Sequence, residues 1–248
     1  NYERFGLTFP LLIKSLDCHD VLSVQVHPDD ELAAERHNSY GKTEMWYVSG
    51  CEPGAALYVG FKDTSITREE YLSAVNEDRL PEILNRVEVK VGDVFFIPAG
   101  TVHALGKGIE VLEIQQTSDV TYRIYDWNRV DDKGNPRELH TALAVDAIDF
   151  EADAELLHKK YDVAKGGEAK VIESPYFTMA IQDIDGKKSL DRSMLDSFVV
   201  YICLEGSATI SVDGVQESLD SGELVLVPAE CCDVEFVGTA RLMEVYIK

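Results

Sequence analysis

The chain has no long hydrophobic run and no surplus of basic residues. None of its apolar stretches in 248 residues approaches the roughly 20 needed to cross a bilayer as a helix, and no basic segment followed by an apolar core opens the sequence. Asp and Glu number 45 against 23 Lys and Arg, which gives a net charge of −22. An acidic surface argues against nucleic acid and anionic membranes, so we expect neither as a partner.

The chain also lacks any Cys-x-x-Cys pair. Its five cysteines show no spacing typical of a metal site, and Cys231 and Cys232 are adjacent. An odd number of cysteines without a signal peptide indicates reduced thiols. We therefore expect a cytoplasmic protein.

Short β-strands, broken by turns, account for most of the sequence. Residues 21–27 alternate strictly, with Gln25 and His27 on one face, and six more runs are β-rich: 44–48, 55–61, 87–90, 93–97, 109–115 and 120–126. Helical patterns are fewer and cover 28–36, 67–76, 81–86 and 138–147. A small helical insertion is expected at about 63–86.

The character of the chain changes after Phe150. Residues 151–170 are polar, and a second β-rich series follows from Val171 to Ile247. This change predicts two domains, a metal-binding catalytic domain over 1–150 and a second, degenerate domain over 151–248.

A repeated phrase links the two halves. Val-Gly-Asp-Val-Phe-Phe-Ile-Pro-Ala begins at Val91, and Ser-Gly-Glu-Leu-Val-Leu-Val-Pro-Ala begins at Ser221. In each copy a Gly-acid turn enters a short apolar strand that ends at Pro-Ala, a pattern typical of cupin jelly rolls. The predicted fold is mainly β, with two cupin-type jelly-roll barrels in tandem.

The copies differ at the residue that follows this phrase. The first continues to His103, and the second has Asp233 at the same offset. This difference predicts a single metal site, in the first barrel, and a second barrel without one.

Four residues of the first half are candidate metal ligands. Gln25 and His27 project from one face of a predicted strand, Glu44 opens the next β-rich run, and His103 adds a second imidazole. Two nitrogens and two oxygens suit a catalytic zinc ion, or Mn²⁺, Fe²⁺ or Co²⁺. Taken singly, each has an ordinary alternative role: a partly buried histidine, a surface acid or an amide that is only a hydrogen-bond partner.

Four segments, in order, resemble the type I mannose-6-phosphate isomerases, also called phosphomannose isomerases, and most closely the short bacterial branch. They read Gln-Val-His-Pro-Asp-Asp from Gln25, Gly-Lys-Thr-Glu-Met-Trp from Gly41, Pro-Ala-Gly-Thr-Val-His-Ala from Pro98 and Ser-Asp-Val-Thr-Tyr-Arg from Ser118. Members of that branch usually have a further segment upstream of Asn1, so the resemblance implies that an N-terminal segment is missing here.

The resemblance implies one zinc per chain, held by Gln25, His27, Glu44 and His103, with Arg123 as an essential active-site cation. Lys42 lies in the family's Lys-x-Glu position and is the preferred proton-transfer group, because Glu44 cannot easily be both a tight ligand and a free base. Longer members have a Tyr where this chain has Leu105, so no role of that Tyr carries over.

A phosphorylated hexose substrate would also need binding groups away from the metal. Asp119 and Arg129 fall at matching offsets around Arg123, and Arg36 and Lys133 are further candidates to bind the phosphate. For Arg36 and Lys133, a solvated surface position is an equal alternative.

The expected activity is isomerisation between mannose 6-phosphate and fructose 6-phosphate by metal-assisted proton transfer through a cis-enediolate. The alternatives are a non-catalytic sugar-binding or regulatory cupin, a metal-dependent cupin dioxygenase, and an isomerase of another hexose phosphate. The oligomeric state is expected to be a monomer or a homodimer.

Overall fold

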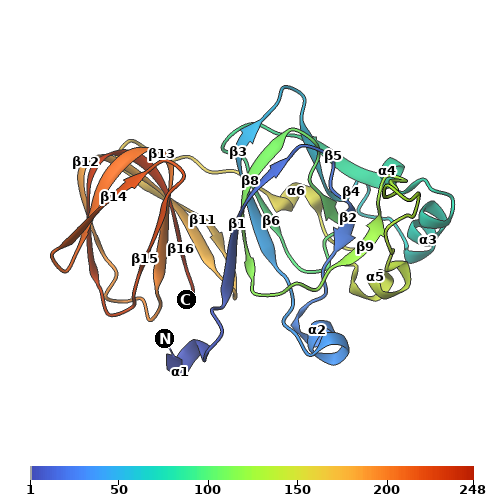
Figure 1. Cartoon of the computed structure of the whole chain (residues 1–248), viewed down its shortest axis with the longest axis horizontal. Coiled ribbons are helices and arrows are strands. Elements are labelled where there is room, and N and C mark those ends of the chain that lie inside the picture. Colours follow the sequence, from blue (N-terminus) through green and yellow to red (C-terminus); the bar gives the residue numbers. More distant parts are fainter. Residues whose placement is uncertain (1) are drawn as a thin grey trace. The chain divides into compact units, whose positions relative to one another are not determined.

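The computed structural model describes residues 2–248, with side chains from Arg4 onward. Two compact units divide the chain between Lys159 and Lys160, within the polar stretch 151–170, and the N-terminal residues through Thr8 cluster with the second unit. We call Phe9–Lys159 the first barrel and the remaining residues the second barrel. The predicted mainly β fold of two cupin-type jelly rolls is confirmed (Figure 1).

The first barrel consists of two five-stranded antiparallel sheets, with strand orders β1-β8-β3-β6-β10 and β5-β4-β7-β2-β9. The strands are β1 (Leu11–Cys18), β2 (Val24–Val26), β3 (Glu44–Cys51), β4 (Ala56–Phe61), β5 (Leu84–Glu88), β6 (Val94–Ile97), β7 (His103–Ala104), β8 (Ile109–Gln116), β9 (Tyr122–Tyr125) and β10 (His158–Lys159).

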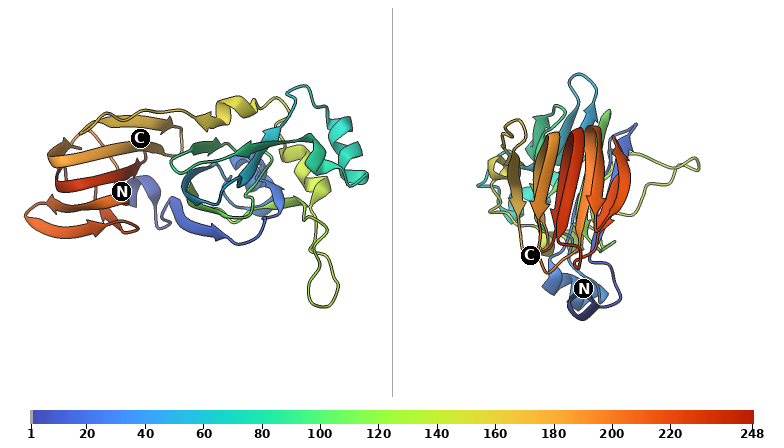
Figure 2. Two further views of the ribbon diagram at one scale, coloured as in Figure 1. Left: turned by 90° about the horizontal axis from the view of Figure 1, so that it is seen from above. Right: turned by 90° about the vertical axis from the view of Figure 1, so that its left-hand side faces the viewer.

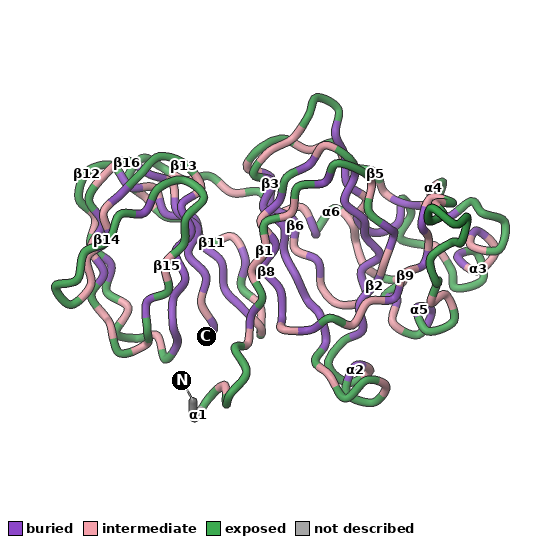
Figure 3. Tube along the Cα trace, viewed as in Figure 1, coloured by how far each residue is buried: buried purple, intermediate pink, exposed green. Residues whose placement is uncertain are grey.

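Two apolar clusters stabilise the first barrel. One lies around Trp46, Phe95 and Val111, on strands β3, β6 and β8, where most residues are buried (Figure 3). The other packs Tyr71 of α3 and Ile148, which follows α5, against the sheet that contains β2 and β9.

Five helices belong to the first barrel: α2 (Asp30–His37), α3 (Arg68–Asn76), α4 (Leu80–Ile83), α5 (Thr141–Ala147) and α6 (Ala154–Leu157). Thr67 and Glu70 form a capping box at the start of α3, which explains the predicted helix over 67–76. The helix predicted over 81–86 is wrong in its second half. Leu84 begins β5, because it is buried and pairs with Phe61 of β4.

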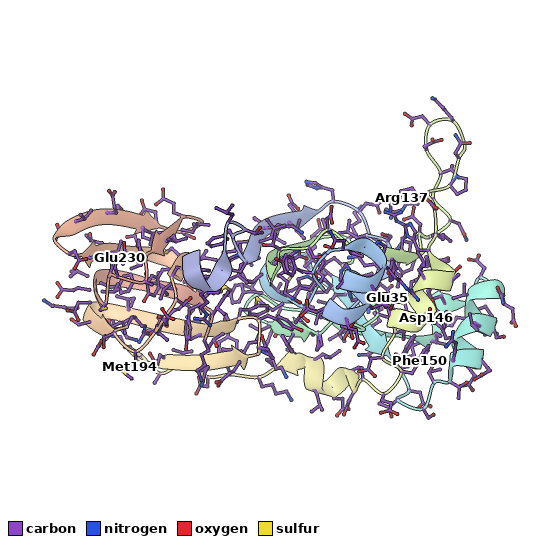
Figure 4. All side chains as sticks on the ribbon, turned by 90° about the horizontal axis from the view of Figure 1, so that it is seen from below. Glu35, Arg137, Asp146, Phe150, Met194 and Glu230 are labelled. Carbon is purple, nitrogen blue, oxygen red and sulfur yellow. The ribbon has the colours of Figure 1, made fainter. Side chains whose placement is uncertain are left out.

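The connection between β9 and α5 contains no regular element and projects from the first barrel (Figure 2, yellow-green). Arg137 lies near its base (Figure 4), where its Nε donates to Oδ2 of Asp126 at 2.7 Å. No helix among the described residues is long and apolar enough to span a membrane.

The second barrel contains the short α1 (Tyr2–Phe5) and a six-stranded antiparallel sheet, in the order β11-β12-β16-β13-β14, with β15 paired to β13. Its strands are β11 (Glu168–Glu173), β12 (Thr178–Asp191), β13 (Val199–Val212), β14 (Val215–Asp220), β15 (Leu224–Val227) and β16 (Asp233–Tyr246). Three of these strands have 14 residues each, and an apolar cluster around Tyr201, Phe236 and Leu242 fills the interior.

Candidate metal centre

One row of side chains crosses three neighbouring strands of the first barrel. Gln25 on β2 pairs with His103 on β7 and, on its other side, with Arg123 on β9. Directly paired residues of an antiparallel sheet project from the same face. The strand register therefore brings together three residues that are far apart in the sequence.

Glu44 reaches this row from the other sheet. It opens β3, where it pairs with Gln115 of β8 and Ile97 of β6. Its Oε2 lies 3.6 Å from Nε2 of His27, and its Oε1 lies 3.3 Å from Nε2 of His103. All three side chains are at most 1% exposed, so the site is enclosed by the barrel.

Backbone carbonyls fix the orientation of both histidines. Nδ1 of His27 lies 2.9 Å from the Val120 carbonyl, and Nδ1 of His103 lies 2.8 Å from the Thr101 carbonyl. A carbonyl can only accept, so each Nδ1 carries the proton and each Nε2 lone pair faces Glu44. Hydrogen bonds of this kind orient metal-ligating histidines in other proteins.

Burial sets the charge of the three residues. Desolvation, with Lys42 and His103 adding to it, lowers the pKa of His27 far below its usual range, and desolvation lowers the pKa of His103 to about 4. Desolvation and then the nearby Glu113 raise the pKa of Glu44, against the opposing effect of Lys42. The histidines are therefore neutral, which is the form that binds metals.

A divalent cation fits this arrangement. Nε2 of His27 and both oxygens of Glu44 are buried without a hydrogen-bond partner among the described residues, an unfavourable state that a cation would relieve. Ligand atoms in a tetrahedral site with bonds of about 2.0–2.1 Å lie about 3.3–3.4 Å apart, close to the spacings given above. Ligand atoms of His27, Glu44 and His103 all lie within 4.8 Å of one another.

Gln25 is the fourth predicted ligand, and its amide contacts the same centre. Its Nε2 lies 3.2 Å from Nε2 of His103. The oxygen and nitrogen of an amide have nearly the same shape, and a rotation of the amide would turn Oε1 toward a cation.

Lys42 is buried beside the candidate ligands. Its Nζ lies 3.3 Å from Oε2 of Glu44, and the residue is only 6% exposed. Gly41 precedes it and allows a close approach to α2, because an added Cβ would lie 2.5 Å from backbone atoms of Asp29 and Asp30. The packing of Gly41 thus positions Lys42 and Glu44.

The sequence patterns did not reveal Glu113 as a member of this site. It is 4% exposed, and it receives hydrogen bonds from Lys14 Nζ at 2.8 Å and Trp46 Nε1 at 3.0 Å. Burial disfavours its ionisation, but Lys42 and Lys14 outweigh that effect and lower its pKa. An acid on the inward face of the strand 109–115, otherwise apolar at Ile109 and Val111, is the signal that could have identified it.

Arg123 is the direct strand neighbour of Gln25, and its side chain is held by other residues of the chain. Its Nε donates to Ser23 Oγ at 3.3 Å, and its Nη1 donates to the Glu138 carbonyl at 3.0 Å. Its backbone N–H donates to Nδ1 of His140 at 3.1 Å. These contacts hold a guanidinium group at one end of the row that contains Gln25 and His103.

The other predicted cations are engaged elsewhere. Arg129 donates to Asp126 at 2.5 Å and to the Val21 carbonyl at 2.6 Å, so its guanidinium stabilises the connection after β9. Arg36 binds Asp146 at 2.6 Å.

Asp146 lines an acidic cavity of about 530 Å³ together with Glu35 (Figure 4), an environment that disfavours a phosphate near Arg36. Asp119 is exposed and lines a different cavity, of about 450 Å³, beside His37 and Tyr122. Lys133 is exposed in the connection after β9.

Known proteins resemble the chain over most of its length. Residues 2–49 match the catalytic domain family of type I phosphomannose isomerases, and residues 167–247 match the mannose-6-phosphate isomerase cupin domain family. The mannose-6-phosphate isomerase of Streptococcus mutans is 35% identical over 245 residues, which cover 97% of this chain and 76% of that protein. ManA, a mannose-6-phosphate isomerase of Bacillus subtilis, is 37% identical over 240 residues, covering 95% and 74%.

Solved structures of mannose-6-phosphate isomerases are also similar to this chain. The crystal structure of the mannose 6-phosphate isomerase from Bacillus subtilis superimposes with a TM-score of 0.87 at 34% identity, covering 96% of this chain and 76% of that one. A phosphomannose isomerase structure from Salmonella typhimurium gives a TM-score of 0.77 at 19% identity, which shows the shared fold. The chain therefore belongs to the type I mannose-6-phosphate isomerase family.

Proposed function

We propose that the chain interconverts mannose 6-phosphate and fructose 6-phosphate with one zinc ion bound by Gln25, His27, Glu44 and His103. The observation that carries this proposal is the buried convergence of two neutral imidazoles and an unsatisfied carboxylate beside Lys42. The named relatives act on this substrate, and their similarity extends over nearly the whole chain.

The reaction moves one proton between C1 and C2 of the open sugar and another between O1 and O2. Negative charge develops on these oxygens, and a bound divalent cation would stabilise it as a Lewis acid. Arg123 supplies a second, fixed positive charge at the end of the Gln25 row.

Lys42 is the proposed proton-transfer group. Glu44 is a ligand in this proposal, which leaves its carboxylate unsuited to act as a free base. The Lys42 amine lies 3.3 Å from that carboxylate, and both residues are buried. Glu113, which Lys14 and Trp46 hold in place, contributes a fixed negative charge close to Lys42.

Similarity to named isomerases over nearly the whole chain favours an isomerase over a cupin dioxygenase, for which we expect three histidines and one glutamate with redox-active iron. Two histidines and one carboxylate can also hold the iron of a non-haem oxygenase, so elemental analysis separates the two classes. All five cysteines are free, and we propose that the protein works in the cytoplasm. Its partner is a phosphorylated hexose.

Turnover of hexose phosphates by the zinc-loaded chain tests the proposal. We expect conversion of mannose 6-phosphate to fructose 6-phosphate, with glucose 6-phosphate as the competing substrate in a parallel assay. Elemental analysis of the active protein should give one zinc per chain. Iron in place of zinc, or a preference for glucose 6-phosphate, would contradict the metal or the substrate assignment.

A further inference from the structure

The two barrels have equivalent strands, as the repeated phrase and the strand register show. β6 (Val94–Ile97) and β15 (Leu224–Val227) are the two copies of the phrase. β6 pairs with β3, and β15 pairs with β13. Ile97 is opposite Glu44, and Val227 is opposite Val199, so Val199 occupies the position of the metal-centre glutamate.

Two residues further along the same strands, both barrels have an aromatic residue paired with a buried acid. Trp46 pairs with Glu113 in the first barrel, and Tyr201 pairs with Glu244 at the equivalent positions of the second. Trp46 Nε1 donates to Glu113 at 3.0 Å, and the Tyr201 hydroxyl donates to Glu244 at 2.9 Å. The second barrel therefore lacks the metal-ligand layer and keeps the adjacent layer of a buried acid and an aromatic donor.

A cation completes this layer in both barrels, but from different strands. Lys14 on β1 binds Glu113, whereas the equivalent position on β12 is Ala180. In the second barrel Arg192, in the segment after β12, supplies the cation. Its Nε and Nη2 donate to the two oxygens of Glu244 at 2.6 and 2.9 Å.

The exchange of Lys14 for Ala180 leaves space beside the buried acid. A cavity of about 280 Å³ is lined by Ala180, Glu244 and Arg192, and also by Glu168, Lys170 and Tyr246. Gln182 organises its acidic side, because its Nε2 donates to Glu168 at 2.9 Å and to Glu244 at 2.8 Å. Glu244 is 1% exposed, so a fully buried carboxylate forms part of the wall.

We propose that this cavity binds an uncharged polyhydroxylated molecule of monosaccharide size. Glu168 and Asp191 supply carboxylate acceptors on its wall, because the two oxygens of Glu244 already accept hydrogen bonds from Arg192, Tyr201 and Gln182. Lys170, which also binds Glu173, and Arg192 have further N–H groups to donate, and vicinal hydroxyl groups require both kinds of partner, since each hydroxyl both donates and accepts. Met194, Leu195 and Ala180 add an apolar side that suits the C–H face of a sugar ring. The volume is slightly below the roughly 300–1,000 Å³ typical of small-molecule sites, which suits a ligand of monosaccharide size.

Charge distinguishes this ligand from the alternatives. The lining contains three acids, Glu168, Asp191 and Glu244, and two cations, Lys170 and Arg192. Glu244 already binds Arg192 through both of its oxygens. An anion such as a hexose phosphate is therefore disfavoured. A metal is disfavoured because Val199 replaces the ligating glutamate and cations lie among the acids. The inference does not depend on the proposed isomerase activity.

Methionine methyl signals separate this site from the catalytic one. The chain has four methionines. Met194 lines the cavity at the surface of the second barrel (Figure 4), whereas Met45 lies on β3 next to Glu44 in the first. In the full chain labelled with ¹³C-methyl methionine, D-mannose should shift the Met194 signal saturably, with a Kd on the order of 1 mM for a ligand of this size.

Variants at the rim make the test specific without breaking the buried Arg192–Glu244 pair. Lys170→Ala and Glu168→Gln change side chains that are about half exposed, and each should raise the Kd at least 10-fold. Lys187→Ala, an exposed lysine of the same unit outside the cavity, should leave it unchanged. Isomerase turnover should stay at the wild-type level in all three.

Three results would overturn the inference. The Met194 signal could stay unmoved by D-mannose up to about 100 mM, far above the expected Kd. It could respond equally in the wild type and in Lys170→Ala and Glu168→Gln. It could also respond more strongly to mannose 6-phosphate than to D-mannose, which would contradict the preference for an uncharged ligand.

Discussion

His27 and Glu44 meet in the interior of the first barrel, with Nε2 3.6 Å from Oε2, and neither atom has a hydrogen-bond partner among the described residues. A carboxylate and an imidazole lone pair are costly to bury together, and Lys42 Nζ, 3.3 Å from Oε2, compensates only the charge of the carboxylate. We interpret this pairing as part of a ligand set for a cation, and the predictions below follow from it.

Removal of one imidazole should abolish metal binding. In His103→Ala we expect the zinc affinity to fall by more than about 100-fold. Losing a residue that only orients a ligand lowers metal affinity by up to about 100-fold, and the loss of the ligand itself should cost more. Dialysis against a chelator followed by elemental analysis measures this. His158→Ala, which removes a half-buried histidine that stacks on Phe95 in the same unit, is the control and should keep its zinc.

Arg123→Ala should retain the metal but turn over slowly. The guanidinium lies at the end of the Gln25 row and makes no contribution to the ligand set. We expect kcat to fall about 100- to 1000-fold, as for the loss of one preorganised charge-stabilising donor. Steady-state kinetics with zinc analysis of the same sample measures both effects. Arg86→Ala, an exposed arginine of β5, should behave as wild type, and a normal kcat in Arg123→Ala would remove that residue from the mechanism.

Gly41→Ala should destabilise the protein, because the new Cβ would lie 2.5 Å from backbone atoms of α2. Overpacking of this kind costs about 1–3 kcal/mol of unfolding free energy. The displaced segment carries Lys42 and Glu44, so turnover should fall as well. Denaturant unfolding measures the first effect, with Glu35→Ala on the exposed side of α2 as the control. Unchanged stability would show that the contact relaxes without strain.

The metal-free protein should become less stable as the pH rises above about 6.5. Burial raises the pKa of Glu44 above its unfolded value of 4.5, so the folded state holds a proton that the unfolded state has lost. That contribution to stability disappears as Glu44 ionises. The two histidines have lowered pKa values in the folded state, and they are neutral in both states above pH 6.5, so they do not oppose this trend there.

Thermal unfolding of chelator-treated protein between pH 6.5 and 8 measures the slope. Zinc should remove it, because the cation replaces the proton, and Glu44→Gln should remove it in the metal-free protein. A slope of the same size in Glu44→Gln would assign it to another group.

The motifs around His27, Glu44 and His103 predicted a shared site, and these side chains do converge in the structure, because strands of a jelly roll place their inward-facing residues around one interior. Glu113 was not predicted. A single acid in an alternating strand has no distinctive pattern, and its role depends on the register that pairs it with Lys14 and Trp46.

The residues expected to bind the phosphate show a second limit of prediction from the sequence. Arg36 and Arg129 lie near the motifs in sequence, but each binds an acid, Asp146 and Asp126 respectively. Asp146 approaches Arg36 from α5, which is 110 residues away in the chain. Proximity in sequence to a motif therefore did not predict which cations remain available to a substrate.

Removal and restoration of the metal tests the central claim most directly. Mannose 6-phosphate turnover should disappear after chelation and return in proportion to added zinc, up to one equivalent per chain, while Glu44→Gln should stay inactive at every zinc level. Turnover that survives complete removal of the metal, or that zinc restores equally in Glu44→Gln, would contradict the assignment of His27, Glu44 and His103 as the catalytic metal centre.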